Sequence, residues 1–417
     1  MKKATVTPIL MSGNDRLDYL DAVRAFALLL GIVFHASLSF LPIYIGWAVM
    51  DISTSPIVGV FILISHSFRM ELFFLVAGFF SHMTFHVKGS AYFLKSRLVR
   101  IAIPFILGWF LLRPLLVSGW VMGAQSMRGD VSIFPALREG FASLLGFLHA
   151  PFTGTHLWFL YYLLLITASL LLVRAVLVSI GPLYAACTKF ADGFIRWLCH
   201  SPLGLVVLAL PTSVCLWFMG QWGMDTPDKA LSPHIPVTLI YGGFFVFGWL
   251  MHRQSDLMRD FSSLTWHKTL LALIAIVDAA MLSDYESQPG HPQYLYLKMA
   301  FKFSYVLMMW SLVAITIGLF RRFLDRPSKT VRYIADSSYW LYLLHLPIVI
   351  WLQIAFAEVG WHWGVKLVSI CIITIGVSLV LYDLWVRSSF IGAVLNGRRK
   401  SRVLFTAGEP AESGPRG

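Results

Sequence analysis

The chain has 417 residues, of which 58% are hydrophobic and only 13% are charged. Soluble domains carry about 25% charged residues, so this composition excludes a set of water-soluble domains. Together with a mean hydropathy of +0.73, it indicates a polytopic membrane protein. The net charge of +12 does not indicate nucleic-acid binding, because the basic residues lie in short loops between apolar segments, as in membrane proteins.

The apolar segments predict an all-α fold. A hydrocarbon layer of about 30 Å takes about 20 helical residues to cross, and the length and apolar character of these segments exclude barrel strands. We therefore expect a polytopic bundle of about ten transmembrane helices. The expected spans are 19–41, 57–80, 99–121, 156–178, 202–220, 234–252, 267–283, 299–320, 333–356 and 362–386.

The chain divides into three predicted parts. Residues 1–18 form a polar N-terminal segment that runs into a full-length apolar segment, without the short apolar region and cleavage site of a signal peptide. Residues 19–386 form the transmembrane domain. Residues 387–417 form a basic tail that we expect to be disordered.

Positive charge sets the predicted orientation. Most of the 33 Lys and Arg residues lie in the N-terminal segment, in alternate loops and in the C-terminal tail. Because basic loops stay on the cytoplasmic side of a membrane, we expect both termini to be cytoplasmic.

The cysteines and histidines show no metal or disulfide pattern. No CxxC or zinc-type spacing connects the four cysteines, Cys187, Cys199, Cys215 and Cys371. His82 and His86 are four residues apart, but no HExxH motif occurs. We expect neither a metal ion nor a permanently bound cofactor.

The first span, LDAVRAFALLLGIVFHASLSF, carries two polar groups in an apolar helix. Arg24 and His35 are eleven positions apart, which is about 1100° of helical rotation, so their side chains share a face and lie about 16 Å apart along the axis. Arg24 alone is equally well explained as an arginine that reaches the headgroups and pairs with Asp21. A single histidine on an apolar face is more often a packed core residue than a catalyst.

The second span contains SHSFRMELFFLVAGFFS and places Arg69 near the bilayer centre, with His66 one turn away. Glu71 is only two positions from Arg69, so it faces elsewhere. A cation inside a membrane is costly without a counter-charge. Arg69 therefore indicates a functional site, unless another helix supplies its partner.

Further polar groups fall in the outer half of the predicted bundle. Arg113 lies late in the third span, and His345 lies past the middle of the ninth. His156 and Trp158 begin the fourth span, where an interfacial aromatic belt is an equally good explanation. We expect Lys302 to reach the headgroups. Several basic groups with few carboxylates beside them indicate an anionic ligand or intermediate.

These side chains predict chemistry between the helices. No Walker A, dinucleotide-binding, GxSxG or kinase motif is present. An imidazole suits general-base activation of a hydroxyl or relay of an acyl group. The arginines suit an anionic, phosphate-bearing donor that arrives from the cytoplasm.

The same segments resemble the acyltransferase family 3 membrane proteins over residues 16–386. LDAVRAFALLLGIVFHASL is similar to the family's first helix, whose hallmark is an arginine and a histidine separated by ten residues, here Arg24 and His35. HSFRMELFFLVAGFF is similar to the second-helix signature of paired phenylalanines and a following glycine. HLWFL at 156–160 and YLLHLPIV at 342–349 resemble later signatures.

Within this family, the sequence resembles the glucan biosynthesis protein C group, the succinyltransferases of osmoregulated periplasmic glucans. The resemblance implies cytosolic acyl-CoA, specifically succinyl-CoA, as co-substrate, a periplasmic glucan or other glycan as acceptor, and a place in the bacterial inner membrane. It implies His35 as the catalytic histidine, Arg24 in donor binding or site architecture, and Arg69 in the same site. Ala77 stands where many relatives carry serine, and we expect no appended esterase-like domain of the kind that many relatives have.

The predicted site thus has two groups of residues. The catalytic group is His35, Arg24 and Arg69, and the substrate-binding group is His66, Arg113, His156, Trp158 and His345. Three alternatives stay open: an O-acetyltransferase for another polysaccharide or glycolipid, a secondary transporter of an anion, and a non-enzymatic partner of a glycan synthase. The sequence also leaves the oligomeric state open, a homo-oligomer included.

Overall fold

The computed structural model describes residues 17–148, 154–227, 231–254 and 256–404. Within these ranges the chain is helical and contains no strand, which confirms the all-α prediction. In this part of the chain nine helical segments are long and apolar enough to cross a membrane, or up to ten if one bent pair of helices counts as a single span.

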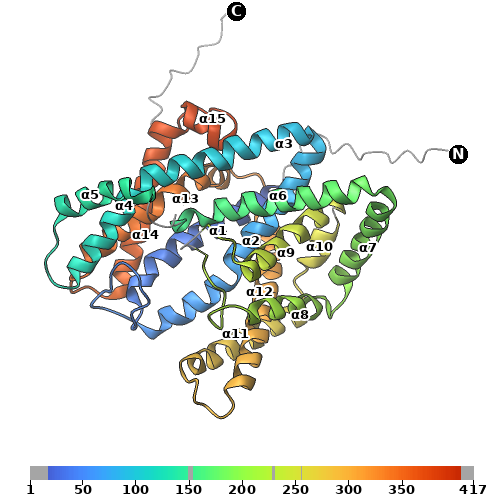
Figure 1. The fold of residues 1–417 in the computed structure, drawn as a ribbon, viewed down its shortest axis with the longest axis horizontal. Coiled ribbons are helices and arrows are strands. Elements are labelled where there is room, and N and C mark those ends of the chain that lie inside the picture. Colours follow the sequence, from blue (N-terminus) through green and yellow to red (C-terminus); the bar gives the residue numbers. More distant parts are fainter. Residues whose placement is uncertain (1–16, 149–153, 228–230, 255, 405–417) are drawn as a thin grey trace, which may run out of the picture.

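Figure 1 shows the helices in chain order. They are α1 (Asp18–Ser37), α2 (Pro56–Lys88), α3 (Ser90–Arg97), α4 (Ile103–Ser126), α5 (Ile133–Ala142), α6 (Trp158–Ser179), α7 (Gly181–His200), α8 (Gly204–Trp217), α9 (Ile235–Arg253), α10 (Leu257–Phe261), α11 (Trp266–Ser283), α12 (Tyr294–Leu324), α13 (Lys329–Phe356), α14 (Trp363–Leu381) and α15 (Phe390–Asn396). A π-helical turn, Leu98–Ala102, joins α3 to α4.

The bent pair is α7 and α8, which meet at an angle of 116°. The expected span at 202–220 is therefore not a straight continuation of the preceding helix. Ser201 precedes Pro202 and takes an extended conformation, as residues before proline usually do. Gly204 then allows the two helices to touch, because a Cβ there would lie only 1.9 Å from the carbonyl oxygen of Leu198.

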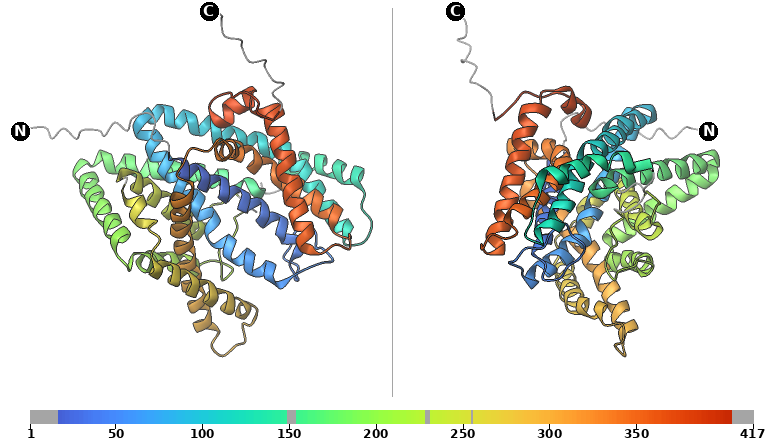
Figure 2. Two further views of the ribbon diagram at one scale, coloured as in Figure 1. Left: turned by 180° about the vertical axis from the view of Figure 1, so that it is seen from behind. Right: turned by 60° about the vertical axis from the view of Figure 1, so that its left-hand side comes forward.

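Figure 2 shows the bundle from two further sides. In the described part of the chain, α2 and α9 pack more extensively than any other pair of helices. Two glycines explain the contact. A Cβ on Gly78 would lie 1.9 Å from the carbonyl oxygen of Phe245, and a Cβ on Gly248 would lie 1.9 Å from that of Leu75. Small residues let helix backbones approach closely inside a membrane. The contact fixes the position of α2, the helix that carries Arg69.

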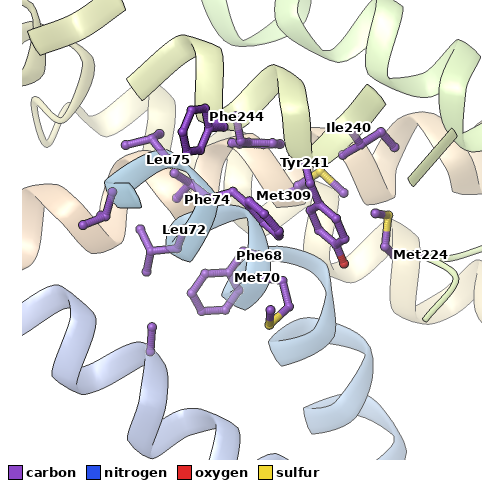
Figure 3. Close-up of a cluster of buried hydrophobic side chains, with 14 of the residues drawn as sticks. Phe68, Met70, Leu72, Phe74, Leu75, Met224, Ile240, Tyr241, Phe244 and Met309 are labelled. Carbon is purple, nitrogen blue, oxygen red and sulfur yellow. The ribbon is translucent and has the colours of Figure 1, made fainter. Parts of the chain in front are cut away.

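Aromatic side chains fill the space beside this contact (Figure 3). The rings of Phe74 and Tyr241 stack with centroids 4.6 Å apart, and Phe244 stacks on Trp310 at 3.8 Å. Met309 is fully buried in the same cluster. These contacts tie α2, α9 and α12 into one core.

Lys302 does not reach the headgroups, so that expectation is wrong. The side chain is 1% exposed, and its ammonium donates to the carbonyl oxygens of Leu216, Gln221 and Trp222 at 2.8, 3.0 and 3.2 Å. A buried ammonium is stable only when its donors are bonded. Lys302 therefore holds the loop between α8 and α9 to the bundle.

The expected disorder of the tail 387–417 is wrong for residues 387–404, which are described and include α15. The reason is the two carboxylates at the ends of α13 and α14. Asp383 accepts the backbone N–H groups of Val403 and Leu404, and Lys400 pairs with Asp336. The rest of the tail and residues 1–16 lie outside the described residues.

Candidate functional site

A cavity of about 390 Å³ lies between α1, α2, α6 and α13. One end is bounded by α3 and α15, where Lys88 is exposed. The other end reaches the loop between α8 and α9, where Thr226 is exposed. None of the described residues that line it is Asp or Glu. The cavity therefore has an exposed residue at each end, and its lining favours anions.

Basic and titratable side chains line the cavity in two groups. The first, which we call the cationic end, lies beside α3 and consists of Arg24, Lys88, Arg97 and Arg100. The second, which we call the imidazole cluster, lies deeper and consists of His35, His66, His156 and His345 together with Arg69. Arg24 and His35 belong to different groups but line the same cavity, in agreement with the shared helical face that their spacing predicts.

Two pairs of rings in the imidazole cluster lie close together. The centroids of His35 and His345 are 5.3 Å apart, and those of His156 and His345 are 5.6 Å apart. His66 stacks on Phe34 at 5.5 Å, and its Nε2 lies 3.1 Å from the hydroxyl of Thr226. Three helices, α1, α2 and α13, and the turn before α6 thus contribute one histidine each.

Hydrogen bonds fix the tautomers of two of these histidines. His156 Nε2 lies 3.0 Å from the carbonyl oxygen of Leu343, and His345 Nδ1 lies 2.8 Å from that of Tyr342. A carbonyl only accepts, so each of these nitrogens carries the proton. The remaining nitrogens, His156 Nδ1 and His345 Nε2, are buried and have no partner among the described residues. Each of these two imidazoles therefore has a ring lone pair that is unpaired within the described residues.

Arg69 is 5% exposed, and its Cζ lies 4.2 Å from the ring centroid of Phe34. Its Nη1 is buried and has no hydrogen-bond partner among the described residues. Glu71 does not line the cavity and is fully buried elsewhere. A buried guanidinium with a donor left over is a binding group for an anion inside the cavity.

Arg24 differs from Arg69 in that it has a counter-charge. Its Nη1 donates to the carboxylate of Asp21 at 3.2 Å, and its side chain is 39% exposed. This is the pairing that the sequence allows for an ordinary arginine near the headgroups. Arg24 nevertheless lines the cationic end, so the pair lies at the entrance.

Three basic residues of the cationic end, Lys88, Arg97 and Arg100, are not among the site residues that the sequence predicts. Arg97 donates to the hydroxyl of Ser81 at 2.6 Å. Arg100 lies against Gly397, where a Cβ would overlap its Nη2 at 1.7 Å. The spacing of Arg97 and Arg100, which puts them on one helical face, is the signal that would have found them.

The structure places the other predicted residues as follows. Trp158 lines the cavity and stacks on Tyr241, with centroids 5.6 Å apart. Arg113 is not among the lining residues; its guanidinium lies 4.9 Å from the ring centroid of Trp109. In the described part of the chain, no group of three or more His, Cys, Asp or Glu side chains is placed to hold a metal ion.

A loop between α1 and α2, residues 41–55, lies next to the imidazole cluster. Trp47 stacks on His35, with centroids 5.8 Å apart and planes at 20°. Asp51 forms a buried ion pair of 2.6 Å with Lys366 at the start of α14. Burial raises the pKa of Asp51 above its ordinary value, and the Lys366 ammonium opposes the rise. This ion pair anchors the loop that carries Trp47.

The fold and the site together define a class: a multi-pass helical membrane protein with an internal cavity lined by basic and imidazole side chains. A family model of the acyltransferase domain, acyltransferase family 3, matches residues 17–383. The chain belongs to this family, and it is by family a membrane acyltransferase.

Two relatives of the chain support this family assignment. The chain is 26% identical over 407 residues to the glucans biosynthesis protein C of Salmonella typhimurium strain LT2, an alignment that covers 92% of this chain and 97% of that protein. It is 26% identical over 398 residues to the protein of the same name in Salmonella typhi, covering 91% and 94% of the two chains. No solved structure matches the chain.

Proposed function

We propose that this protein transfers a succinyl group from cytosolic acyl-CoA to hydroxyl groups of a periplasmic glucan, as a multi-pass protein of the bacterial inner membrane. The observation that carries the proposal is one cavity that is cationic at one end and lined by imidazoles deeper inside, with an exposed residue at each end. The names of the relatives support a glucan as acceptor. The α3 end then faces the cytoplasm, which the distribution of basic loops also favours.

The cationic end suits the phosphate groups of CoA. Arg97 and Arg100 offer planar guanidinium donors that match phosphate oxygens, and Lys88 adds a mobile point charge. The pantetheine arm would then run along the apolar wall of α2, past Phe80 and Val76. His35 lies about 16 Å further along α1 than Arg24, a distance that the extended arm can cover.

The imidazole cluster suits the transfer step. The acceptor hydroxyl enters past Thr226 and gives its proton to His35 as its oxygen attacks the thioester carbonyl carbon. The new C–O bond forms, the C–S bond breaks, and the departing CoA thiolate takes the proton back from the imidazolium. The lone pairs of His156 and His345 are placed to accept from neighbouring hydroxyls of the sugar.

Arg69 supports an acyl group that itself carries a charge. A succinyl group ends in a carboxylate, which would pair with the buried guanidinium next to His35. An acetyl group would leave this cation without a partner in a low-dielectric site, which is costly.

Mass analysis of periplasmic glucans tests the proposal. Glucans from a strain that lacks the protein should lose their succinyl mass increments, and the wild-type gene should restore them. The His35→Ala variant should fail to restore them, whereas His267→Ala, a histidine outside the cavity, should succeed. Proteoliposomes that accumulate an anion without any acylated product would instead assign the protein as a transporter.

A further inference from the structure

Gln353 lies on α13, two turns beyond His345 and next to the end of α1. Its side chain is 1% exposed. A primary amide is costly inside an apolar bundle unless its donors and acceptor are bonded. Here all of its polar atoms are used, and every bond leads to His35 or to a residue that contacts it.

The amide nitrogen of Gln353 donates to the carbonyl oxygens of His35 and Ala36, at 2.9 and 3.0 Å. These carbonyls belong to the last turn of α1, which ends at Ser37. The last carbonyls of a helix have no complete set of helical N–H partners. The His35 carbonyl already accepts the backbone N–H of Leu38, so Gln353 adds a second donor there and a donor at Ala36, and so fixes the backbone of the residue that carries the imidazole.

The amide oxygen of Gln353 accepts a hydrogen bond of 2.9 Å from the indole N–H of Trp47. The Trp47 ring in turn stacks on His35. The orientation of the amide follows from its partners, because the carbonyls cannot donate and the indole nitrogen cannot accept. Gln353 therefore holds His35 from two directions, through its backbone and through the ring that covers its imidazole.

We propose that Gln353 is a positioning residue for acyl transfer, which holds the end of α1 and the Trp47 ring so that the imidazole of His35 meets the acyl group in one orientation. The inference rests on the proposed function, since it needs His35 to act on the acceptor. Gln353 does not line the cavity, so it acts without touching substrate.

The test compares kinetic constants of purified variants with succinyl-CoA and a glucan acceptor. Gln353→Met has a similar length but neither donates nor accepts strongly. A misplacement of about 1 Å costs about 100-fold in rate, so we expect kcat to fall by about 10- to 100-fold. The KM for acyl-CoA should stay near the wild-type value, because the donor binds at the cationic end.

Two further variants separate the two bonds. Trp47→Phe keeps a stacked ring but loses the indole N–H, so its kcat should fall less than that of Gln353→Met. The double variant should be no slower than Gln353→Met alone, because both changes remove the same bond. Gln353→Glu keeps an acceptor for Trp47 but loses the donors to α1, and it provides the test if the methionine variant does not fold.

Trp351→Phe is the matched control. Its indole donates to the carbonyl oxygen of Leu115 at 3.0 Å, so it removes the same type of bond from the same helix but on the side that faces α4. This variant should keep the wild-type kcat. A folded Gln353 variant with wild-type kcat, or an equal loss in Trp351→Phe, would overturn the inference. A wild-type protein that makes no acylated product would instead overturn the proposed function.

Discussion

The cationic end and the imidazole cluster lie in one cavity but are built in different ways. The cationic end is assembled from the start of α1, the end of α2, the short helix α3, a π-helical turn and the C-terminal segment. Arg24 and Lys88 are at least partly open to solvent. The imidazole cluster is carried by the long helices α1, α2 and α13 and by the turn before α6, and two of its tautomers are fixed by backbone carbonyls. A flexible phosphate-bearing group needs only charge, whereas the reacting atoms need a fixed geometry. This difference predicts that substitutions at the cationic end affect acyl-CoA binding and that substitutions in the imidazole cluster affect turnover.

The largest effect is expected at His35. His35→Ala removes the general base, which contributes about 10²–10⁴-fold to rate, so kcat should fall by at least 100-fold while acyl-CoA still binds. Single-turnover assays with labelled succinyl-CoA and a separate binding measurement check both parts. A variant that loses acyl-CoA binding together with turnover would contradict the division between the two ends.

Arg69 should set the choice of acyl group. Wild-type protein should prefer succinyl-CoA to butyryl-CoA, which has a similar chain but no carboxylate. In Arg69→Met the ratio of the two rates should fall by up to about 100-fold, as expected for the loss of a buried charge pair of about 2–3 kcal/mol. Competition assays with both donors measure the ratio, and Arg69→Lys should restore part of it. An equal loss with both donors would mean that Arg69 stabilises the structure or the transition state and does not bind a carboxylate.

At the cationic end, Arg97→Ala combined with Arg100→Ala should raise the KM for acyl-CoA by about tenfold with little change in kcat, since two charge-assisted bonds to phosphate are lost. Added salt should weaken acyl-CoA binding by the wild-type protein and have less effect on the variant. Lys95→Ala on α3, which does not line the cavity, is the control. A fall in kcat with unchanged KM would place these arginines at the chemistry.

The smallest effect on turnover is expected at the buried pair of Asp51 and Lys366, which should affect stability instead. Lys366→Met leaves a buried carboxylate without its partner and should cost about 3–5 kcal/mol at neutral pH. Burial raises the pKa of Asp51 in the folded state, so the folded state takes up a proton before the unfolded state does, and the variant should recover stability as the pH falls. Thermal unfolding in detergent between neutral and acidic pH checks this, with Asp51→Asn/Lys366→Met as the control. If the Lys366→Met variant lost as much stability at acidic pH as at neutral pH, the unpaired Asp51 carboxylate would not be the cause of the loss.

The helical fold and the core of the site were predictable from the sequence because they depend on distances within one helix. The positions of Arg24 and His35 on one face follow from helical periodicity alone, and the cost of Arg69 inside a membrane marks it without knowledge of its neighbours. The bend between α7 and α8 was also encoded locally, in Pro202.

The remaining features depend on contacts between distant parts of the chain. Trp47 and Gln353 are 306 residues apart in sequence, and no pattern within either segment indicates that they touch. Arg113 is another example. The sequence gives its position along the third span, but it does not show whether the side chain lines the cavity or lies on another face of the helix. The order of residues 387–404 likewise comes from Asp336 and Asp383, which lie on other helices.

The most direct test of the account is a sided transfer assay in proteoliposomes of known orientation. With acyl-CoA on the side of the α3 end and the glucan on the other side, the account predicts acylated glucan, and no product when the two substrates exchange sides. Equal product in both arrangements, or transfer only when both substrates are on one side, would contradict a cavity that receives its donor and its acceptor from opposite faces of the membrane.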